Sequence, residues 1–368
     1  MQRGIIFGLA SAALFGLSTP LAKSLLGTVH PLLLAGLLYA GSGLGLLIVL
    51  GVRHLMPRTG AAIGLPSGIE WWWLAAAILF GGIAGPVALM YGLLTTPASS
   101  ASLLLNLEAV FTALLAWFVF RENFDRRIAL GMAAIIVGGL VLAWSSGEGK
   151  GASSGSLLIA AACFCWALDN NLTRRASAAD AVLIASLKGL VAGAVNVSLA
   201  VFLGQRLPSP AISAAAMIVG LSGYGVSLVL FVLALRDLGS ARTGAYFSVA
   251  PFFGAVAAIA LQGDAVTSQL LVAGALMAVG VWLHVTEHHE HVHAHDAQEH
   301  THLHVHDEHH RHSHSFAWDG REPHVHAHVH DKLVHAHRHY PDVHHRHAHE
   351  GSVADAGDSN GSTDRSTR

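Results

Sequence analysis

Charged residues are scarce in this chain of 368 residues. Asp, Glu, Lys and Arg make up 12% of it, whereas soluble domains contain about 25%, and 53% of the residues are hydrophobic. The mean hydropathy is +0.51. The sparse charges are also unevenly divided, because residues 1–286 carry an excess of Lys and Arg and residues 287–368 an excess of Asp and Glu. An ordinary soluble domain is thereby excluded, and the composition predicts a membrane protein with a polar tail.

Cysteine is almost absent, and several functional motifs are missing. The two cysteines, Cys163 and Cys165, lie two residues apart in an apolar run, where a helix directs them to different faces. They are therefore expected to pack as small residues rather than to form a disulfide, and a soft-metal pair is the minor alternative. The sequence contains no phosphate-binding loop, ATP-binding motif or nucleophile–base constellation. We expect neither an enzyme nor a nucleic-acid partner, and no required cofactor.

Long apolar runs occupy the first 286 residues. A helix needs about 20 mostly apolar residues to cross the bilayer, and a barrel would instead show alternating segments of about ten residues. Short connections rich in Pro, Gly and Ser separate the runs. The sequence therefore predicts ten membrane-spanning helices, at 4–26, 31–51, 72–95, 99–120, 127–145, 155–174, 181–204, 212–235, 241–262 and 267–286.

The loops between these runs predict the orientation of the chain. Lys and Arg favour cytoplasmic loops. With the N-terminus inside, ten of these residues fall in inside segments, and Lys150 and Arg206 fall outside. Because the number of spans is even, we expect both termini in the cytoplasm and the protein in the cytoplasmic membrane, in contact with the lipid bilayer.

The sequence contains an internal duplication. At an offset of 151, residues 12–23 align with 163–174, and at an offset of 142, residues 98–122 align with 240–264. Two copies of five spans are the simplest interpretation, and the odd number gives the copies opposite orientations. Inverted repeats of this kind are typical of secondary transporters, whose substrate site lies where the repeats meet near the midplane.

Several short segments of the body have a familiar pattern. They are 96–102, 107–113, 120–122 and 131–142 in the first half, and 238–244, 250–264 and 274–280 in the second. In these segments the body resembles the EamA-like branch of the drug/metabolite transporter superfamily. The resemblance implies paired five-helix repeats and transport of a small solute. Two departures occur: Glu108-Ala109 and Ala250-Pro251 stand where the family often has Glu-Pro, and Asp264 stands where Glu is usual.

The predicted fold is thus an all-α membrane protein of two inverted five-helix repeats followed by a disordered tail. We expect the first repeat at 1–146, a linker at 147–154, the second repeat at 155–286 and a His-rich cytoplasmic tail at 287–368. The tail has too few apolar residues to fold alone. The oligomeric state stays open.

A few polar residues fall inside the predicted spans. A charge there costs about 2.5–3.5 kcal/mol on insertion scales, so each requires a partner or a water-filled path. A carboxylate among them is expected to bind a cation or a coupling proton, with a lysine as the counter-charge. The alternative is an ion pair, such as Asp169 with Lys188, that only holds helices together. The candidate substrate-binding or coupling residues are Glu108, Asn106, Asp169, Asn170 and Lys188.

The tail contains 24 of the 27 histidines. They alternate with small residues, and in an extended chain alternate side chains share a face, so that neighbouring imidazoles can share one ion. Imidazole suits Zn, Ni, Cu and Co. We expect several weak, exchanging metal sites; a proton-sensing tail, titrating near pH ~6.5, and a passive solubilising tail are the alternatives. The candidate ligands are His288, His289, His291, His293, His295, His302, His304, His306, His324, His326, His328, His330, His335, His337, His339, His344, His345, His347 and His349.

Three functions are compatible with these features. The first is a secondary transporter that exports a small solute by alternating access, with the tail as a metal sensor or buffer. The second is a Zn, Ni or Co efflux transporter whose tail captures the cargo. The third is a metal-responsive membrane protein that transports nothing, although duplicated inverted halves favour transport.

Overall fold

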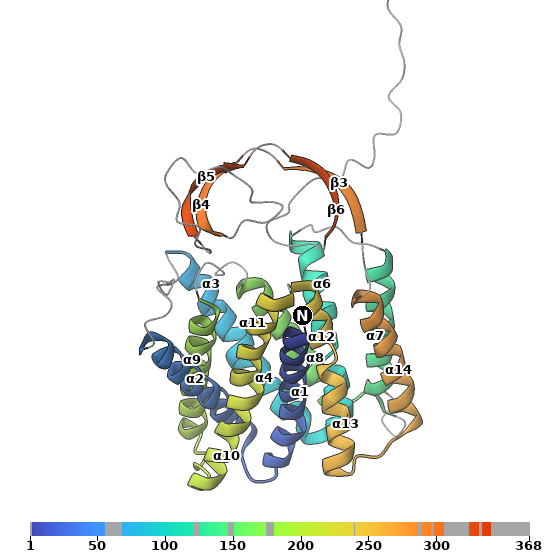
Figure 1. Ribbon diagram of the computed structural model, residues 1–368. Helices are drawn as coiled ribbons and strands as arrows, with labels where there is room; N and C mark the ends of the chain where they lie inside the picture. The colour runs from blue at the N-terminus through green and yellow to red at the C-terminus, as the bar shows by residue number, and fades with distance from the viewer. Residues whose placement is uncertain are drawn as a thin grey trace, which may run out of the picture. The chain divides into compact units, whose positions relative to one another are not determined.

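The protein consists of two compact units, 1–287 and 288–368. Figure 1 shows the computed structural model, which describes residues 2–55, 68–120, 126–145, 151–173, 180–238, 240–285, 289–295, 298–304, 324–330 and 333–339.

The first unit is a bundle of apolar helices. Each of the ten predicted spans corresponds to one helix or to two helices, except that the third and eighth spans each consist of two α-helices with a π-helix between them. The first half contains α1 (Gln2–Leu25), α2 (Pro31–Leu55), α3 (Glu70–Ala77), the π-helix η1 (Ile78–Ala84), α4 (Gly85–Thr95), α5 (Ala98–Leu104), α6 (Leu107–Phe120) and α7 (Arg126–Ala143). The short strands β1 (Trp144–Ser145) and β2 (Gly151–Ala152) follow, and the second half contains α8 (Ser154–Thr173), α9 (Ala181–Phe202), α10 (Pro210–Gly220), the π-helix η3 (Leu221–Val226), α11 (Ser227–Leu238), α12 (Ser240–Phe247), α13 (Ala250–Gln262) and α14 (Ser268–Val285).

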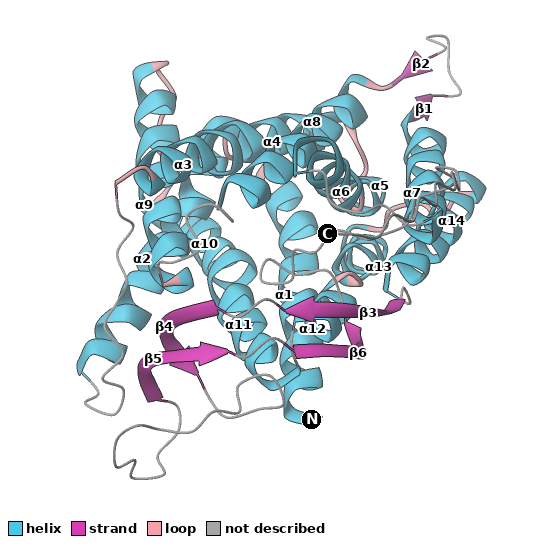
Figure 2. Cartoon of the chain, turned by 90° about the horizontal axis from the view of Figure 1, so that it is seen from above, coloured by secondary structure: helices cyan, strands magenta, loops and turns pink. Residues whose placement is uncertain are grey.

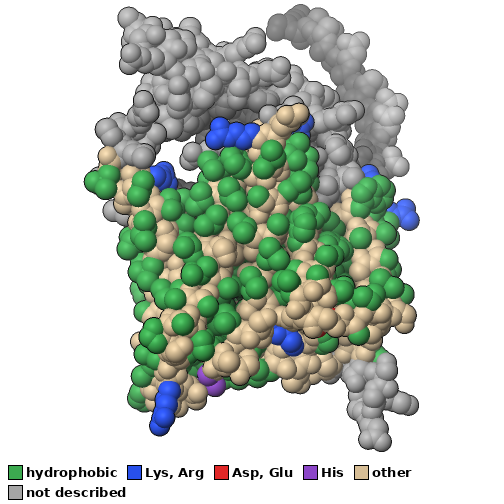
Figure 3. Space-filling model, turned by 60° about the horizontal axis from the view of Figure 1, so that its bottom comes forward, with side chains coloured by type: hydrophobic (Ala, Val, Ile, Leu, Met, Phe, Trp, Pro, Cys, Tyr) green, Lys and Arg blue, Asp and Glu red, His purple; other side chains and the backbone are tan. Residues whose placement is uncertain are grey.

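The helices are apolar enough to lie in a bilayer. Within the described part of the chain, nine are long enough to cross a membrane, and a tenth apolar helix, Ser268–Leu283, is shorter. Large apolar side chains stay exposed, among them Trp72 at 78% and Phe202 at 86%, and hydrophobic side chains cover most of the face in Figure 3. An apolar exterior of this extent is what lipid contact requires.

The two halves pack through corresponding helices. The second helices of each half, α2 and α9, lie together, and the fifth helices, α7 and α14, lie together on the other side of the bundle (Figure 2). Glycine permits the first approach, because a Cβ at Gly189 would lie only 2.7 Å from the Gly43 Cα. A Cβ at Gly280 would likewise lie 2.6 Å from the Gly131 oxygen. Small residues at helix contacts are the usual means of close packing in membranes.

The irregularities of the two halves also correspond. The third span of each half contains a π-helical segment, η1 and η3, and the fourth span is interrupted in each, at 105–106 and at 248–249. Both π-helical segments are rich in glycine. π-Bulges and interrupted helices are frequent at functional sites, and broken spans in transporters lie near the substrate.

The described residues of the second unit form four strands: β3 (His289–His295), β4 (Gln298–His304), β5 (His324–His330) and β6 (Leu333–His339). The disorder predicted for 287–368 as a whole stays a prediction. Two antiparallel sheets form, β3 with β6 and β4 with β5. The physical reason is the alternation of histidine with Val, Ala, Thr and Leu, whose period of two suits a strand. Predicted ligands His288, His306, His344, His345, His347 and His349 lie outside the described residues.

Candidate functional site

The break in the fourth span is closed by side chains. The Asn106 amide donates to the Leu103 carbonyl at 2.9 Å and contacts the Met277 sulfur at 3.8 Å. The buried Cys163 thiol lies 3.6 Å from the Leu104 carbonyl. Interruption of a helix leaves carbonyls without intrahelical partners. Asn106 and Cys163 therefore stabilise the break, and both cysteines are free thiols.

Glu108 lies directly after this break, in the first turn of α6. The Asn170 amide, on α8, donates to its carboxylate at 2.9 Å. Asn170 also reaches the Thr112 hydroxyl at 3.5 Å. Glu108 is half-buried and Asn170 is exposed. A carboxylate whose partner in the protein is a neutral amide keeps the capacity to attract a cation or a proton.

Asp169 and Lys188 form an ion pair, as the alternative interpretation of these residues predicted. The Lys188 ammonium, on α9, donates to both carboxylate oxygens of Asp169, at 2.5 and 2.6 Å. The Thr173 hydroxyl donates to the same carboxylate at 2.9 Å. The two charged side chains are 10% and 17% exposed. The pair joins α8 to α9 next to Asn170. We call Glu108, Asp169, Asn170 and Lys188 the polar cluster.

Gly81, in η1, connects this cluster to aromatic residues. Its carbonyl accepts hydrogen bonds from the Tyr39 hydroxyl at 2.8 Å and the Trp166 indole at 3.0 Å. A Cβ at position 81 would overlap the Asp169 carboxylate. A π-helical turn shifts the hydrogen-bond register, and here the Gly81 carbonyl serves two side chains from α2 and α8.

A row of aromatic rings extends from this point across the bundle. Tyr39 packs against Tyr224 of η3 with ring centroids 5.5 Å apart, and Phe15 lies 6.0 Å from Tyr224 and 5.4 Å from Phe247. These rings are half-buried and come from both halves of the chain. Their faces can hold the apolar part of a solute or a cationic group.

A second polar group joins the halves at the membrane side opposite the N-terminus. The Asp264 carboxylate accepts a hydrogen bond from the Ser99 backbone amide at 2.8 Å, in the first turn of α5. The Lys23 ammonium donates to the Leu93 and Thr96 carbonyls at 2.8 and 2.5 Å, at the end of α4. Carboxylates suit helix N-termini and ammonium groups suit C-termini. The Asp264 contact thus joins the two halves, and the Lys23 contacts join α1 to the end of α4.

The sequence pattern indicated the charged residues and missed the aromatic ones. Asn106, Glu108, Asp169, Asn170 and Lys188 stood out because a polar residue in a span is costly. The structure brings Glu108, Asp169, Asn170 and Lys188 together, and places Asn106 in the helix break. Tyr39, Trp166, Tyr224 and Thr112 carried no signal of their own, since aromatic and hydroxyl residues are common in apolar spans. Gly81 was identified only as a packing residue.

Among the residues whose side chains the structure describes, no group of three or more His, Cys, Asp or Glu side chains is placed to hold a metal ion. Of the predicted ligands in the tail, thirteen lie in β3 to β6, and His300, which was not predicted, lies in β4.

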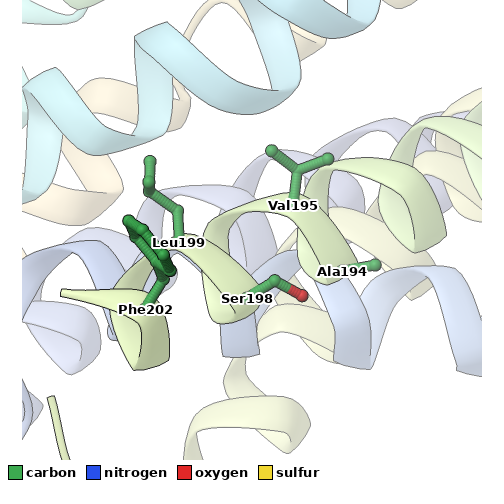
Figure 4. Close-up of a pocket in the computed structure, with 5 residues that line it drawn as sticks. All are labelled: Ala194, Val195, Ser198, Leu199 and Phe202. Atoms are coloured by element: carbon green, nitrogen blue, oxygen red, sulfur yellow. The ribbon is translucent and has the colours of Figure 1, made fainter. Parts of the chain in front are cut away.

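A shallow hollow of about 440 Å³ lies on the surface of α9 (Figure 4). All its lining residues belong to this one helix: Ala194, Val195, Ser198, Leu199 and Phe202. It is apolar and contains none of the predicted site residues, so it is a depression in the lipid-facing surface rather than a solute site.

Two inverted sets of apolar helices around a mid-span polar cluster define a multi-pass membrane transporter. The chain belongs to the EamA-like transporter family, whose model matches residues 2–144 and 153–286.

Two curated relatives are named as transporters, and a solved structure has a similar fold. An uncharacterized transporter of Methanothermobacter thermautotrophicus is 28% identical, over 76% of this chain and 85% of its own length. A probable amino-acid metabolite efflux pump of Salmonella typhimurium is 28% identical, over 74% of this chain and 91% of its own length. A crystal structure with 21% identity, covering 76% of this chain and 94% of its own, has the same fold with a TM-score of 0.55.

Proposed function

We propose that the protein is a secondary transporter that exports a small solute across the cytoplasmic membrane by alternating access, with Glu108 as the solute-binding or coupling carboxylate. The observation that supports this proposal best is the position of Glu108. It follows the break in the fourth span, and its partner is the neutral Asn170 amide at 2.9 Å. The neighbouring Asp169 is already neutralised by Lys188 at 2.5 Å. Glu108 is thus the carboxylate of the cluster that is available to a cation or a proton.

Alternating access is supported by the symmetry of the two halves. Each half has a π-helical third span and an interrupted fourth span. Irregular backbone gives a membrane helix places at which it can bend. Because the halves are inverted, a bend in one half opens the site to one side and the corresponding bend in the other half opens it to the other side. Neither coupling nor binding requires a cofactor in this scheme.

The solute is proposed to carry a protonated amino group. Glu108 would pair with the ammonium, the Asn170 amide would accept or donate a further hydrogen bond, and the rings of Tyr39 and Tyr224 would hold the remaining part of the molecule. The name of the Salmonella relative concerns an amino-acid metabolite, and an amino acid or a derivative fits this arrangement.

The orientation is proposed from the charges of the loops. The excess of Lys and Arg in the loops on the side of the N-terminus supports a cytoplasmic location of both termini. The tail then samples cytoplasmic metal, and we propose that it serves as a sensor or buffer of Zn, Ni, Co or Cu.

The test is transport by a Glu108→Gln variant in inverted membrane vesicles, with radiolabelled amino acids as the probe. The substitution preserves shape and removes the charge, so uptake should fall at least about tenfold, the equivalent of 1.4 kcal/mol. Thermal stability in detergent should change little. The matched control is Glu70→Gln at the first turn of α3, which should transport normally. Normal uptake by Glu108→Gln would remove Glu108 from the site.

Efflux of a divalent metal is the second candidate, and the histidine-rich tail favours it. Metal content would be measured in cells that express the full-length protein, a form lacking residues 288–368, and Glu108→Gln under Zn, Ni and Co load. Lower metal content that depends on Glu108 would support metal cargo. Equal content in all three would leave the organic solute as the cargo.

A further inference from the structure

The strands of the tail place histidines directly opposite one another. In the sheet of β3 and β6, three cross-strand pairs consist of two histidines each: His289 with His339, His291 with His337, and His293 with His335. The sheet of β4 and β5 repeats this arrangement: His300 with His328, His302 with His326, and His304 with His324. Direct partners share one face of a sheet, and so do residues two apart along a strand. Each sheet therefore has a face whose positions are occupied by three histidine pairs.

On the opposite face of the first sheet, apolar residues pair with apolar residues and an acidic residue pairs with a basic one. Val292 pairs with Ala336, Ala294 with Val334, and Glu290 with Arg338. Apolar and opposite-charge partners each stabilise an antiparallel pair by roughly 0.2–1 kcal/mol. A shift of one residue would place the histidines of one strand opposite the Val, Ala, Glu and Arg positions of the other, so the histidine pairs depend on this register.

The two sheets share one register. His295 pairs with Leu333, and Gln298, three residues further along, pairs with His330, three residues further back. The segments between them, 296–297 and 331–332, are equal in length. The described pairs of both sheets thus follow the same register, which is not expected of histidines scattered in a tail.

We propose that each sheet binds one divalent transition-metal ion through four histidines, supplied by two neighbouring cross-strand pairs. In the first sheet these are His291, His293, His335 and His337; in the second, the central pair His302–His326 and one neighbouring pair. This inference specifies the metal-binding role proposed above for the tail and does not depend on what the helical unit transports.

The backbone geometry suits such a site. Direct partners on antiparallel strands have Cα atoms about 4.5–5.5 Å apart, and residues two apart on a strand are separated by about 6.8 Å. Four histidine positions therefore form a rectangle of roughly 5 by 7 Å, and imidazole nitrogens bind zinc at about 2.0–2.1 Å. Imidazoles without thiolates favour Zn, Ni, Cu or Co over Mg or Ca.

The metal would also hold the strands together. An isolated two-stranded sheet is marginally stable in water. An ion bound to both strands fixes their separation and register, so that binding and strand pairing are coupled. The tail would thus form its strands fully when metal is present.

The experiment titrates the full-length protein in detergent with Zn²⁺ by calorimetry, with Mg²⁺ as the control ion. We expect two tightly bound zinc ions per chain. The decisive variant exchanges neighbouring residues in β6: His335→Ala with Ala336→His, and His337→Arg with Arg338→His. It keeps the composition and the number of histidines and moves two of them to the other face. One zinc site should weaken about hundredfold or more, since its ligands no longer act together.

The matched control exchanges the apolar positions, Val334→Ala with Ala336→Val, and should retain both sites. Hydrogen exchange of residues 289–304 and 324–339 supplies a second readout, and these amides should gain protection with Zn²⁺. Two tight sites in the His-exchanged variant would refute the register-based sites and leave metal binding by the tail intact. No tight zinc in the unaltered protein would refute the register-based sites, and no zinc binding of any strength would also refute metal binding by the tail.

Discussion

Replacement of Gly81 by alanine should disrupt the ion pair inside the helical unit. A Cβ at this position would overlap the Asp169 carboxylate, which Lys188 and Thr173 hold on its other side. The Gly81 carbonyl also receives the Tyr39 and Trp166 hydrogen bonds, which fix the backbone of η1. The carboxylate must therefore move away, and the Asp169–Lys188 contact lengthens or breaks.

The magnitude follows from two contributions. Overpacking of a well-packed interior costs about 1–3 kcal/mol, and breaking a buried pair by loss of one partner costs about 3–5 kcal/mol. The two charged side chains keep 10% and 17% exposure, and water reduces the second contribution. We expect the free energy of unfolding to fall by about 3 kcal/mol, which lowers Tm by several degrees.

Thermal unfolding in detergent measures the change, and Gly51→Ala is the matched control. A Cβ at Gly51 meets open space, and alanine is the better helix former by about 1 kcal/mol. Gly81→Ala should also be measured in an Asp169→Gly, Lys188→Met background, where no side chain at position 169 overlaps the new Cβ and the substitution should be less harmful. Equal stability of the Gly81→Ala and Gly51→Ala proteins would contradict the reasoning.

The other predictions concern single contacts and the tail. Lys188→Met alone should reduce thermal stability more than Lys188→Met combined with Asp169→Leu, because the single change leaves an unpaired carboxylate; the reverse order in thermal unfolding would exclude a structural pair. Asp264→Ala should lower the free energy of unfolding by about 1 kcal/mol, since the Ser99 amide loses its cap, and Asp264→Asn should restore part of it. Zinc binding by the tail requires neutral imidazoles, so calorimetric affinity should be full at pH 7.5 and be lost as the pH falls below ~6.5; affinity that is independent of pH would argue against histidine ligands.

The span pattern of the body was predictable because hydrophobicity acts over whole segments. Each predicted run corresponds to helices in the structure, and the duplication corresponds to matching irregularities in both halves. The charged members of the polar cluster were predictable for a related reason: a charge in a span is rare and requires a partner. The choice of Lys188 as the partner of Asp169 followed from the small number of charges available.

The positions of η1 and η3 were not predictable from periodicity. A π-helical segment inserts one residue into an otherwise regular helix, and glycine-rich apolar sequence shows no break in pattern there. The convergence of Tyr39 and Trp166 on Gly81 depends on that local change. Aromatic residues at the centre of the bundle consequently looked like any others in the spans.

The pairing of the tail was missed for a different reason. The alternation of histidine with small residues was recognised as favouring shared ions along one strand. Whether His291 lies opposite a histidine or an alanine depends on residues more than forty positions away. Non-local register of this kind cannot be deduced from the composition of either segment alone, which is why His300 was not among the predicted ligands.

The two halves share a scaffold and differ in chemistry at one pair of equivalent helix contacts. Helix α8 contacts α6, and its counterpart α1 contacts α13, the counterpart of α6. The first contact is polar, with Asn170 donating to Glu108. At the second, Ala250 occupies the position equivalent to Glu108, and a Cβ at Gly16 would overlap the Ala250 backbone. The two halves therefore share their irregular positions but not the polar contact at Glu108. In the alternating-access mechanism proposed above, the irregular positions of both halves would serve as hinges that expose the Glu108 contact to either side of the membrane.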